Sequence, residues 1–171
     1  EGFAASMFVG SAPGDPRELT GLLDYGRICD NAELREAVLE RLRSAPGTFD
    51  VWKELREIEH DEVQGLATEK MIATVTNVEQ MIEAADAVDD DEDGQEKLVA
   101  RVKELVLDEK ALEQILNDCD NDSFLFIVAF EKLVDMADTA LRCLTLYVNW
   151  ETCDDESEKV LDKLFSLVTR D

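Results

Sequence analysis

Acidic residues at alternate positions are the first candidates for chemistry in this sequence. Two short segments place aspartates at every second position: Asp89, Asp91 and Asp93, and then Asp118, Asp120 and Asp122. Carboxylate oxygens are the ligands that hard cations such as Ca²⁺ prefer, so these six residues are the candidate metal ligands.

The segment that begins at Asp89 resembles the first half of a calcium-binding EF-hand loop, because Gly94 follows its three acids at the sixth position. The match ends there. Position 8 is Glu96 instead of an apolar residue, and position 12 is Ala100 instead of a bidentate glutamate; in the second segment position 12 is Ala129. The interpretation that we favour is polar turns with helix caps. A degenerate EF-hand-like, calcium-linked regulator is an alternative.

The residues needed for most enzyme chemistry are scarce. Glu57 and His60 have the Glu-x-x-His spacing of di-iron bundles, but such sites need two of these motifs and His60 is the only histidine. His60 would also have to serve as the base for any activated serine or cysteine, and no nucleophile is positioned beside it in the sequence. Neither of the two common glycine-rich phosphate-binding motifs occurs. The sequence therefore predicts a non-enzyme without a cofactor.

The four cysteines give no metal or disulfide pattern. Cys29, Cys119, Cys143 and Cys153 form no CxxC pair and lack zinc spacing. We expect reduced thiols in an intracellular, cytoplasmic compartment, with import into an organelle as the alternative. Residues 1–14 lack the basic start and apolar run of a secretory signal. We expect them to be poorly ordered, either as a non-native extension before Met7 or as the new end left by a removed transit peptide.

The charge is strongly unbalanced. The net charge is −24, from 41 acidic and 17 basic residues. Such a surface repels phosphate backbones and anionic membranes, which argues against direct binding to nucleic acid. Three interpretations fit the excess of acids: a well-solvated surface, adaptation to high salt, or a role in binding a basic partner or in mimicking the charge of a nucleic acid.

The longest helical pattern covers residues 124–150. Its polar residues are separated by steps of 4, 3, 4, 3 and 4, which is helical spacing: Glu131, Asp135, Asp138, Arg142, Thr145 and Asn149. The other positions are mostly apolar, so we predict one central helix, about 40 Å long at 1.5 Å per residue. Its internal charges argue against insertion into a membrane.

Shorter helical patterns surround this segment. They cover about residues 15–23, 30–44, 50–58, 61–88, 98–116 and 155–168, and the first two begin at predicted caps, Asp15 followed by Pro16, and Asp30. The 61–88 pattern is either one helix or two that break near Thr76 and Asn77, and the 98–116 pattern is either one helix or two with a second cap at Asp108. An acidic loop is expected near residues 86–96, where six acids fall within eight residues. We predict an all-α fold of about seven or eight helices in one domain, residues 15–171. An irregular bundle around the central helix is favoured, and a short α-solenoid of helical hairpins is the alternative.

Aromatic residues at the two ends of the central pattern suggest where a partner would bind. Phe124, Phe126, Phe130 and Trp150 are the candidate partner-binding residues. The leading hypothesis is a non-catalytic, acidic helical interaction domain (an adaptor, scaffold or regulator) that binds a protein with a basic or amphipathic surface. The alternative from another class is a charge mimic that occupies the basic cleft of a nucleic-acid-binding protein. The oligomeric state is left open.

Overall fold

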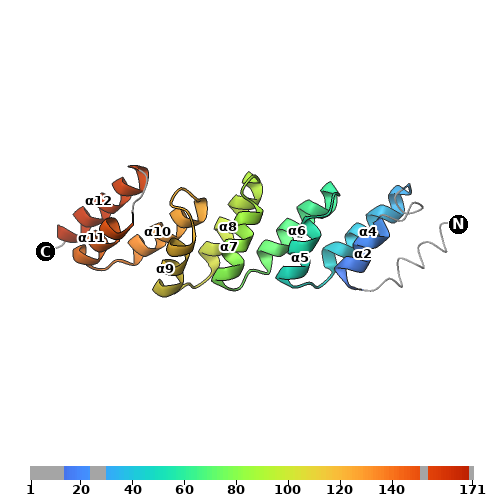
Figure 1. Ribbon diagram of the computed structural model, residues 1–171, viewed down its shortest axis with the longest axis horizontal. Helices are drawn as coiled ribbons and strands as arrows, with labels where there is room; N and C mark the ends of the chain where they lie inside the picture. The colour runs from blue at the N-terminus through green and yellow to red at the C-terminus, as the bar shows by residue number, and fades with distance from the viewer. Residues whose placement is uncertain (1–13, 24–29, 151–153, 170–171) are drawn as a thin grey trace. The chain divides into compact units, whose positions relative to one another are not determined.

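The computed structural model describes residues 14–23, 30–150 and 154–169 (Figure 1). Within these residues the chain forms ten helices and no strand, so the prediction of an all-helical chain is confirmed. No helix of this described part is both long and apolar enough to cross a bilayer. The helices fall into two compact units, Glu1–Val75 and Thr76–Asp171. The sequence predicted one domain over residues 15–171, and whether the two units fold as one cooperative domain stays a prediction.

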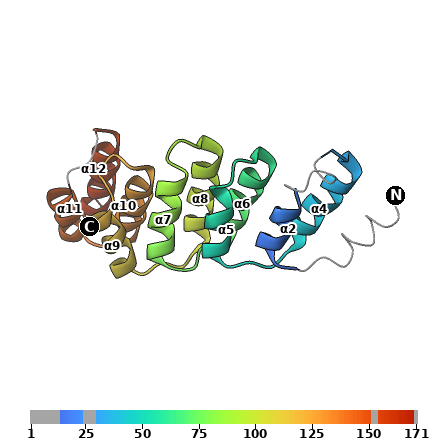
Figure 2. The same ribbon diagram turned by 45° about the vertical axis from the view of Figure 1, so that its right-hand side comes forward.

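The first unit contains two pairs of helices. α2 (Pro16–Leu23) packs against α4 (Ala32–Ser44), and α5 (Phe49–Arg56) packs against α6 (Asp61–Ala73), with α2 also touching α5 (Figure 2). The buried side chains at the centre of this unit include Leu19, Val38, Leu42, Trp52, Leu55, Val63 and Met71. Salt bridges Arg17–Glu54 and Arg35–Glu62 join the two pairs at the surface.

Gly47 lies in the connection between α4 and α5, where a side chain would not fit. A Cβ at this position would lie 2.4 Å from Nε1 of Trp52, whose side chain is buried. The indole therefore packs directly over the glycine backbone, and the short connection from α4 to α5 depends on the absence of a side chain there.

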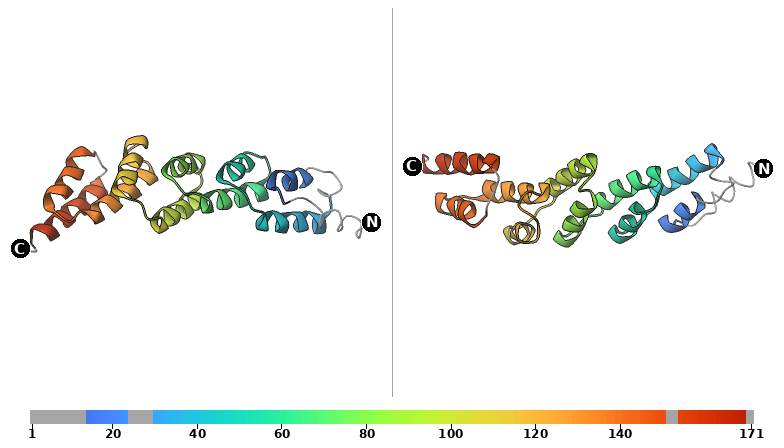
Figure 3. Two further views of the ribbon diagram at one scale, coloured as in Figure 1. Left: turned by 90° about the horizontal axis from the view of Figure 1, so that it is seen from below. Right: turned by 45° about the horizontal axis from the view of Figure 1, so that its top comes forward.

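The second unit contains three successive hairpins. α7 (Val78–Ala87) pairs with α8 (Glu92–Glu104), α9 (Glu109–Asp118) with α10 (Phe124–Met136), and α11 (Ala140–Asn149) with α12 (Asp154–Val168). α7 touches α9, while α10 touches both α8 and α12, so the α9/α10 hairpin lies between the other two (Figure 3). The core of this unit includes Met81, Leu98, Val102, Leu112, Ile115, Leu125, Phe130 and Leu133.

The predicted central helix over residues 124–150 is wrong: it is two helices, α10 and α11. Ala137 ends α10 in an extended conformation, and Oγ1 of Thr139 accepts a hydrogen bond from the backbone N–H of Arg142 as the N-cap of α11. An N-cap of this kind supplies a partner for an otherwise unpaired helix-start N–H, so the chain can turn here without losing hydrogen bonds. The bundle was predicted to pack around one helix of 27 residues, whereas α10 has only 13 residues.

The predicted acidic loop over residues 86–96 is also largely helical. α7 continues to Ala87 and α8 begins at Glu92, which leaves only residues 88–91 between them, and Val88 is buried. Oδ1 of Asp91 accepts from the backbone N–H of Gly94, 3.0 Å away. The acids stabilise a helix start here because negative charge is favourable beside the N-terminal end of a helix dipole.

The structure has more helices than the seven or eight that were predicted. Part of the difference comes from the break at residues 137–139. The 61–88 pattern is likewise two helices, α6 and α7, because Oδ1 of Asn77 caps α7 by accepting from the backbone N–H of Gln80. The 98–116 pattern divides in the same way at Asp108, whose Oδ1 accepts from the N–H of Ala111. Capping side chains divide patterns that look continuous by periodicity.

Candidate functional site

The predicted partner-binding aromatics are mainly core residues. The side chains of Phe126 and Phe130 are 3% and 1% exposed, and their rings lie 6.3 Å apart between centroids. Trp150 is half-buried and meets Phe126 edge-on, also at 6.3 Å, while Phe124 is half-buried at the start of α10. This cluster packs the end of α11 onto α10. The side chains of Phe126 and Phe130, two of the predicted partner-binding residues, are therefore packed against the protein's own residues.

A different apolar surface is open to solvent. Nine large apolar side chains are exposed among the described residues, and seven of these lie on the α11/α12 hairpin. We name this set the open face: Leu141, Leu144, Tyr147, Val148, Leu161, Phe165 and Val168. The most exposed are Leu141 at 75% and Phe165 and Val148 at 73%.

The open face lies on the side of the hairpin that points away from α9/α10. On α12, Lys159 and Lys163 contact α10, whereas Leu161 and Phe165 lie roughly 160° from them at 100° per residue. On α11 the same separation applies between Arg142, which contacts Glu109 of α9, and Leu144. Since α11 and α12 pack side by side, the two apolar stripes form one surface.

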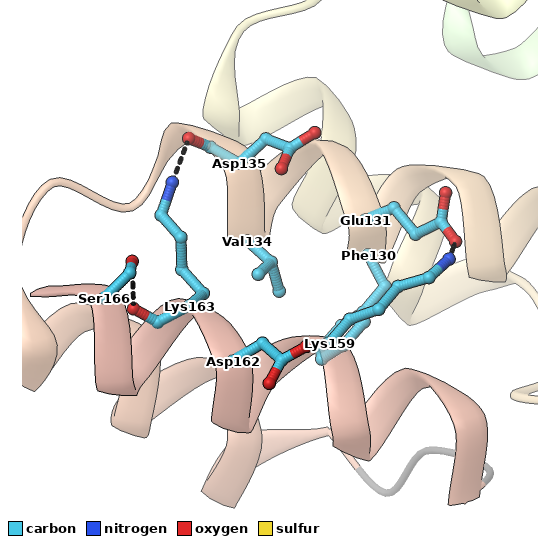
Figure 4. Close-up of a pocket in the computed structure, with 8 residues that line it drawn as sticks. All are labelled: Phe130, Glu131, Val134, Asp135, Lys159, Asp162, Lys163 and Ser166. Atoms are coloured by element: carbon cyan, nitrogen blue, oxygen red, sulfur yellow. Dashed lines mark hydrogen bonds and ion pairs between the residues drawn. The ribbon is translucent and has the colours of Figure 1, made fainter.

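The other side of the hairpin is attached to α9/α10 through cations. Arg142 forms a salt bridge with Glu109, and Lys159 forms one with Glu131. Nζ of Lys163 donates to the carbonyl oxygen of Asp135, 3.0 Å away (Figure 4). The sulfur of Cys143 lies 3.6 Å from the carbonyl oxygen of Val160, inside the hairpin.

A groove lies between α10 and α12 in the second unit. Its volume is about 330 Å³, and it is lined by Phe130, Glu131, Val134, Asp135, Lys159, Asp162, Lys163 and Ser166 (Figure 4). Both lysines are bonded to α10, and Oγ of Ser166 donates to the carbonyl oxygen of Lys163, 2.7 Å away. The two lysines thus hold α12 on α10, whereas the Ser166 hydrogen bond lies within α12.

The six candidate metal ligands occupy helix ends. Asp91 caps α8, and Asp93 in the first turn of α8 pairs with Lys97, with 2.7 Å between Oδ2 and Nζ. Asp118 is the last residue of α9, and the carbonyl oxygen of Asp120 accepts from the N–H of Ser123. No group of three or more possible metal ligands is found within the described residues. Asp89 and Asp122 are exposed, and the backbone carbonyl oxygen of Asp89 accepts from Nε2 of Gln95.

The residues that were considered for enzyme chemistry, and the cysteines, are also placed by the fold. His60 precedes α6 as its N-cap residue, and its Nδ1 is buried without a hydrogen-bond partner, whereas Glu57 ends α5 with an exposed carboxylate. Burial and the nearby carboxylates of Asp86 and Asp118 raise the pKa of Cys119 to about 11, and burial raises the pKa of Cys143. Both thiols are free; Cys29 and Cys153 lie outside the described residues.

No protein-family model, curated protein or solved structure matches this chain. The arguments for function therefore come from the geometry alone. The open face was not predicted, because Leu141, Leu144 and Val148 lie on the apolar side of the 124–150 pattern, which was expected to be buried. A usable signal was present: apolar residues occur on more than half of the α11 circumference, which is more than one packing partner can cover.

Proposed function

We propose that this chain is a non-catalytic protein-interaction domain that binds its partner through the open face. The observation that carries the proposal is the concentration of exposed apolar side chains on the α11/α12 hairpin, where Leu141 and Phe165 are about three-quarters exposed. A contiguous apolar surface of this kind on a folded protein is typical of a binding surface. The proposed binding site differs from the aromatic residues that the sequence predicted, but the proposed class of function is the same.

The packing of the second unit gives the physical reason. We take its three hairpins to be layers of a short α-solenoid, in which each layer contacts only its neighbours. In a solenoid each layer buries its apolar faces against the layers beside it. No layer among the described residues covers the apolar outer face of α11/α12, which favours a surface that another protein covers.

Two substitutions on the open face test the proposal. The double variant Leu141→Asp/Phe165→Asp should weaken the affinity for a partner by at least about thirtyfold, because losing a strong interface contact costs about 2 kcal/mol. Val106→Asp is the matched control, because Val106 is fully exposed in the α8–α9 connection and lies outside the open face. Circular dichroism should show the same helix content for all three proteins.

The measurement has two parts. A neutral apolar dye such as Nile red should brighten with the wild-type chain and with Val106→Asp, and much less with the double variant. Quantitative affinity capture from cell extract should then show proteins that the wild type and Val106→Asp retain and the double variant loses. Equal dye signals together with equal capture by all three chains would contradict the proposal.

The two alternatives have less support. A nucleic-acid charge mimic requires carboxylates arrayed at phosphate-like intervals on one face. Exposed acids occur in both units, on α4 and α6 and on α8 and α12, and competition with DNA for a partner would test whether they form such an array. A calcium-linked regulator requires the aspartates to act as ligands, and Asp91 and Asp93 already have partners within α8. Calcium titration followed by calorimetry would test the second alternative, which predicts heat release at millimolar calcium.

A further inference from the structure

We propose that the partner of the open face is a basic amphipathic helix, which lies on α11/α12 as the next layer of helices. This inference rests on the proposed function, and it adds the chemistry and the orientation of the partner. It starts from a feature of the second unit: the hydrogen bonds and salt bridges between successive hairpins are made by basic side chains of the later hairpin.

Four basic residues show this pattern. Lys132 of α10 donates from Nζ to the carbonyl oxygens of Val102 and Leu105 at the end of α8, at 2.8 and 3.2 Å. Arg142 of α11 pairs with Glu109 of α9, and Lys159 and Lys163 of α12 bond to Glu131 and to the Asp135 carbonyl of α10. These three cations repeat the arrangement one hairpin later. In each case a cation reaches back to an acceptor on the hairpin before it.

The open face carries the acceptors for one more such contact. Glu158 and Asp162 are exposed and lie beside the apolar stripe of α12, at i−3 from Leu161 and from Phe165. Neither carboxylate forms an ion pair among the described residues, and Figure 4 shows Asp162 without a partner while Lys159 and Lys163 extend to α10. The nearby basic side chains are therefore directed away from the open face.

The size of the stripe sets the length of the partner. Leu141 to Val148 on α11 and Leu161 to Val168 on α12 each extend about 10 Å at 1.5 Å per residue. A helix with two apolar turns, about 11 Å at 5.4 Å per turn, covers this length. Its apolar residues would meet both stripes, and a Lys or Arg at one edge would reach Glu158 and Asp162.

A second copy of the chain is a poorer occupant. Each copy carries a net charge of −24, and each open face has the same unpaired acids at its edge. Like charge of this size opposes self-association, whereas a basic helix is attracted to the acidic surface.

Two synthetic peptides of 18 residues test the inference on the full chain. Both carry leucines at i, i+3, i+4 and i+7; one has Lys and Arg beside the leucine stripe, and the other has Glu at the same positions. Fluorescence anisotropy in 50 mM salt should show tighter binding of the basic peptide, by about five- to tenfold or more, because two exposed ion pairs contribute that much. Raising the salt to 500 mM should reduce the difference.

Substitutions then locate the contact. Glu158→Lys with Asp162→Lys should weaken binding of the basic peptide by about five- to tenfold and should improve binding of the acidic one. Glu96→Lys with Glu113→Lys is the matched control, since both residues are exposed without an ion pair on α8 and α9 and the net charge changes equally. Phe165→Asp should abolish binding of either peptide.

The outcomes separate the two proposals. If both peptides bind equally and Phe165→Asp abolishes both, the open face binds helices without charge selection, and only the present inference fails. If peptide binding is absent or indifferent to Phe165→Asp, this inference fails, and the Leu141→Asp/Phe165→Asp capture experiment decides the proposed function separately. If sedimentation shows a wild-type dimer that Phe165→Asp separates, the occupant is a second copy and the inference is overturned.

Discussion

The α9/α10 and α11/α12 hairpins both contain apolar helical stripes but are covered to different extents. Seven of the thirteen residues of α10 are buried, whereas only two of the ten residues of α11 are. Phe130 of α10 is 1% exposed and Phe165 of α12 is 73% exposed. Both phenylalanines occupy an apolar helical stripe, so residue type does not explain the difference.

Position in the stack explains it. α10 touches α8 on one side and α12 on the other, so apolar residues around most of its circumference find a partner. The α11/α12 hairpin is covered only by α9/α10 within the described residues, and its second apolar side is the open face. An apolar stripe shows that a surface is suited to packing, but the neighbouring layer decides whether it is core or binding site.

The largest effect is expected from truncating the two phenylalanines. Phe130→Ala should lower the free energy of unfolding by about 3–5 kcal/mol, because it removes a fully buried ring and leaves a cavity. Phe165→Ala should change it by less than about 0.5 kcal/mol, since the ring is mostly in water already. Urea unfolding followed by circular dichroism measures both. Similar losses for the two variants would show that the open face is covered within the chain.

A smaller effect is expected from Lys132, which connects the α9/α10 hairpin to α8. Lys132→Met should lower the free energy of unfolding by about 1–2 kcal/mol, because the carbonyl oxygens of Val102 and Leu105 lose a charged donor. Burial and the nearby Lys103 lower the pKa of Lys132, which reduces the net gain from this contact. Lys110→Met, at an exposed position of α9, is the control, and an equal loss in both variants would argue against the role of the contact.

The alkylation rate of Cys119 should depend on pH differently from that of an ordinary thiol. The pKa of Cys119 is raised to about 11 from 9.0, so its alkylation by iodoacetamide should keep accelerating up to about pH 11. At pH 8 the reaction should be about tenfold slower than that of an ordinary thiol, since a hundredfold loss of thiolate is partly offset by greater nucleophilicity. Mass spectrometry of the separate cysteine peptides measures the rate, and a plateau near pH 9 would contradict the raised pKa.

The raised pKa of Cys119 also predicts the direction in which stability changes with pH. Because the folded pKa of Cys119 lies above its unfolded value, the protonated thiol contributes to stability below pH 9, and this contribution is lost as the pH rises towards 11. Cys143 should react slowly for a different reason. Its side chain is completely buried inside the α11/α12 hairpin, so the reagent reaches it only after local opening.

Much of the secondary structure could be predicted from capping residues. Asp15 and Pro16 mark the start of α2 as expected, with the N–H of Arg17 donating to Oδ1 of Asp15. Asp108 likewise caps α9. The predicted cap at Asp30 is one residue early, because Asn31 accepts from the N–H of Leu34 and is the actual N-cap. Local hydrogen bonding of this kind depends on neighbouring residues only, so the sequence contains it.

The break between α10 and α11 could not be found by periodicity. Asp138 and Thr139 occupy the polar side of the 124–150 pattern, so helical spacing continues through the residues at which the helix ends. The burial of Phe126 and the exposure of Leu144 could not be predicted for a related reason: both residues are apolar, and only the stacking of hairpins makes one core and the other surface. Contacts between layers involve residues far apart in sequence, which no local pattern contains.

The smallest effect tests the break itself. Thr139→Ala should lower the free energy of local opening of α11 by about 1 kcal/mol, because the N–H of Arg142 loses its capping oxygen. Hydrogen exchange of the α11 amides should then be about fivefold faster, with little change in α10. Ser123→Ala removes the equivalent cap of α10, whose oxygen accepts from the N–H of Phe126 at 3.2 Å, and serves as the matched variant.

The two cap variants should differ because their helices are held differently. α10 is packed on two sides, so Ser123→Ala should affect its exchange mainly through global unfolding, whereas α11 can open separately at the end of the stack. If Thr139→Ala instead raises the helix content and slows exchange at residues 137–139, the cap alone keeps α10 and α11 apart. The chain would then be able to form the continuous helix over 124–150 that its periodicity predicts, at the expense of the open face.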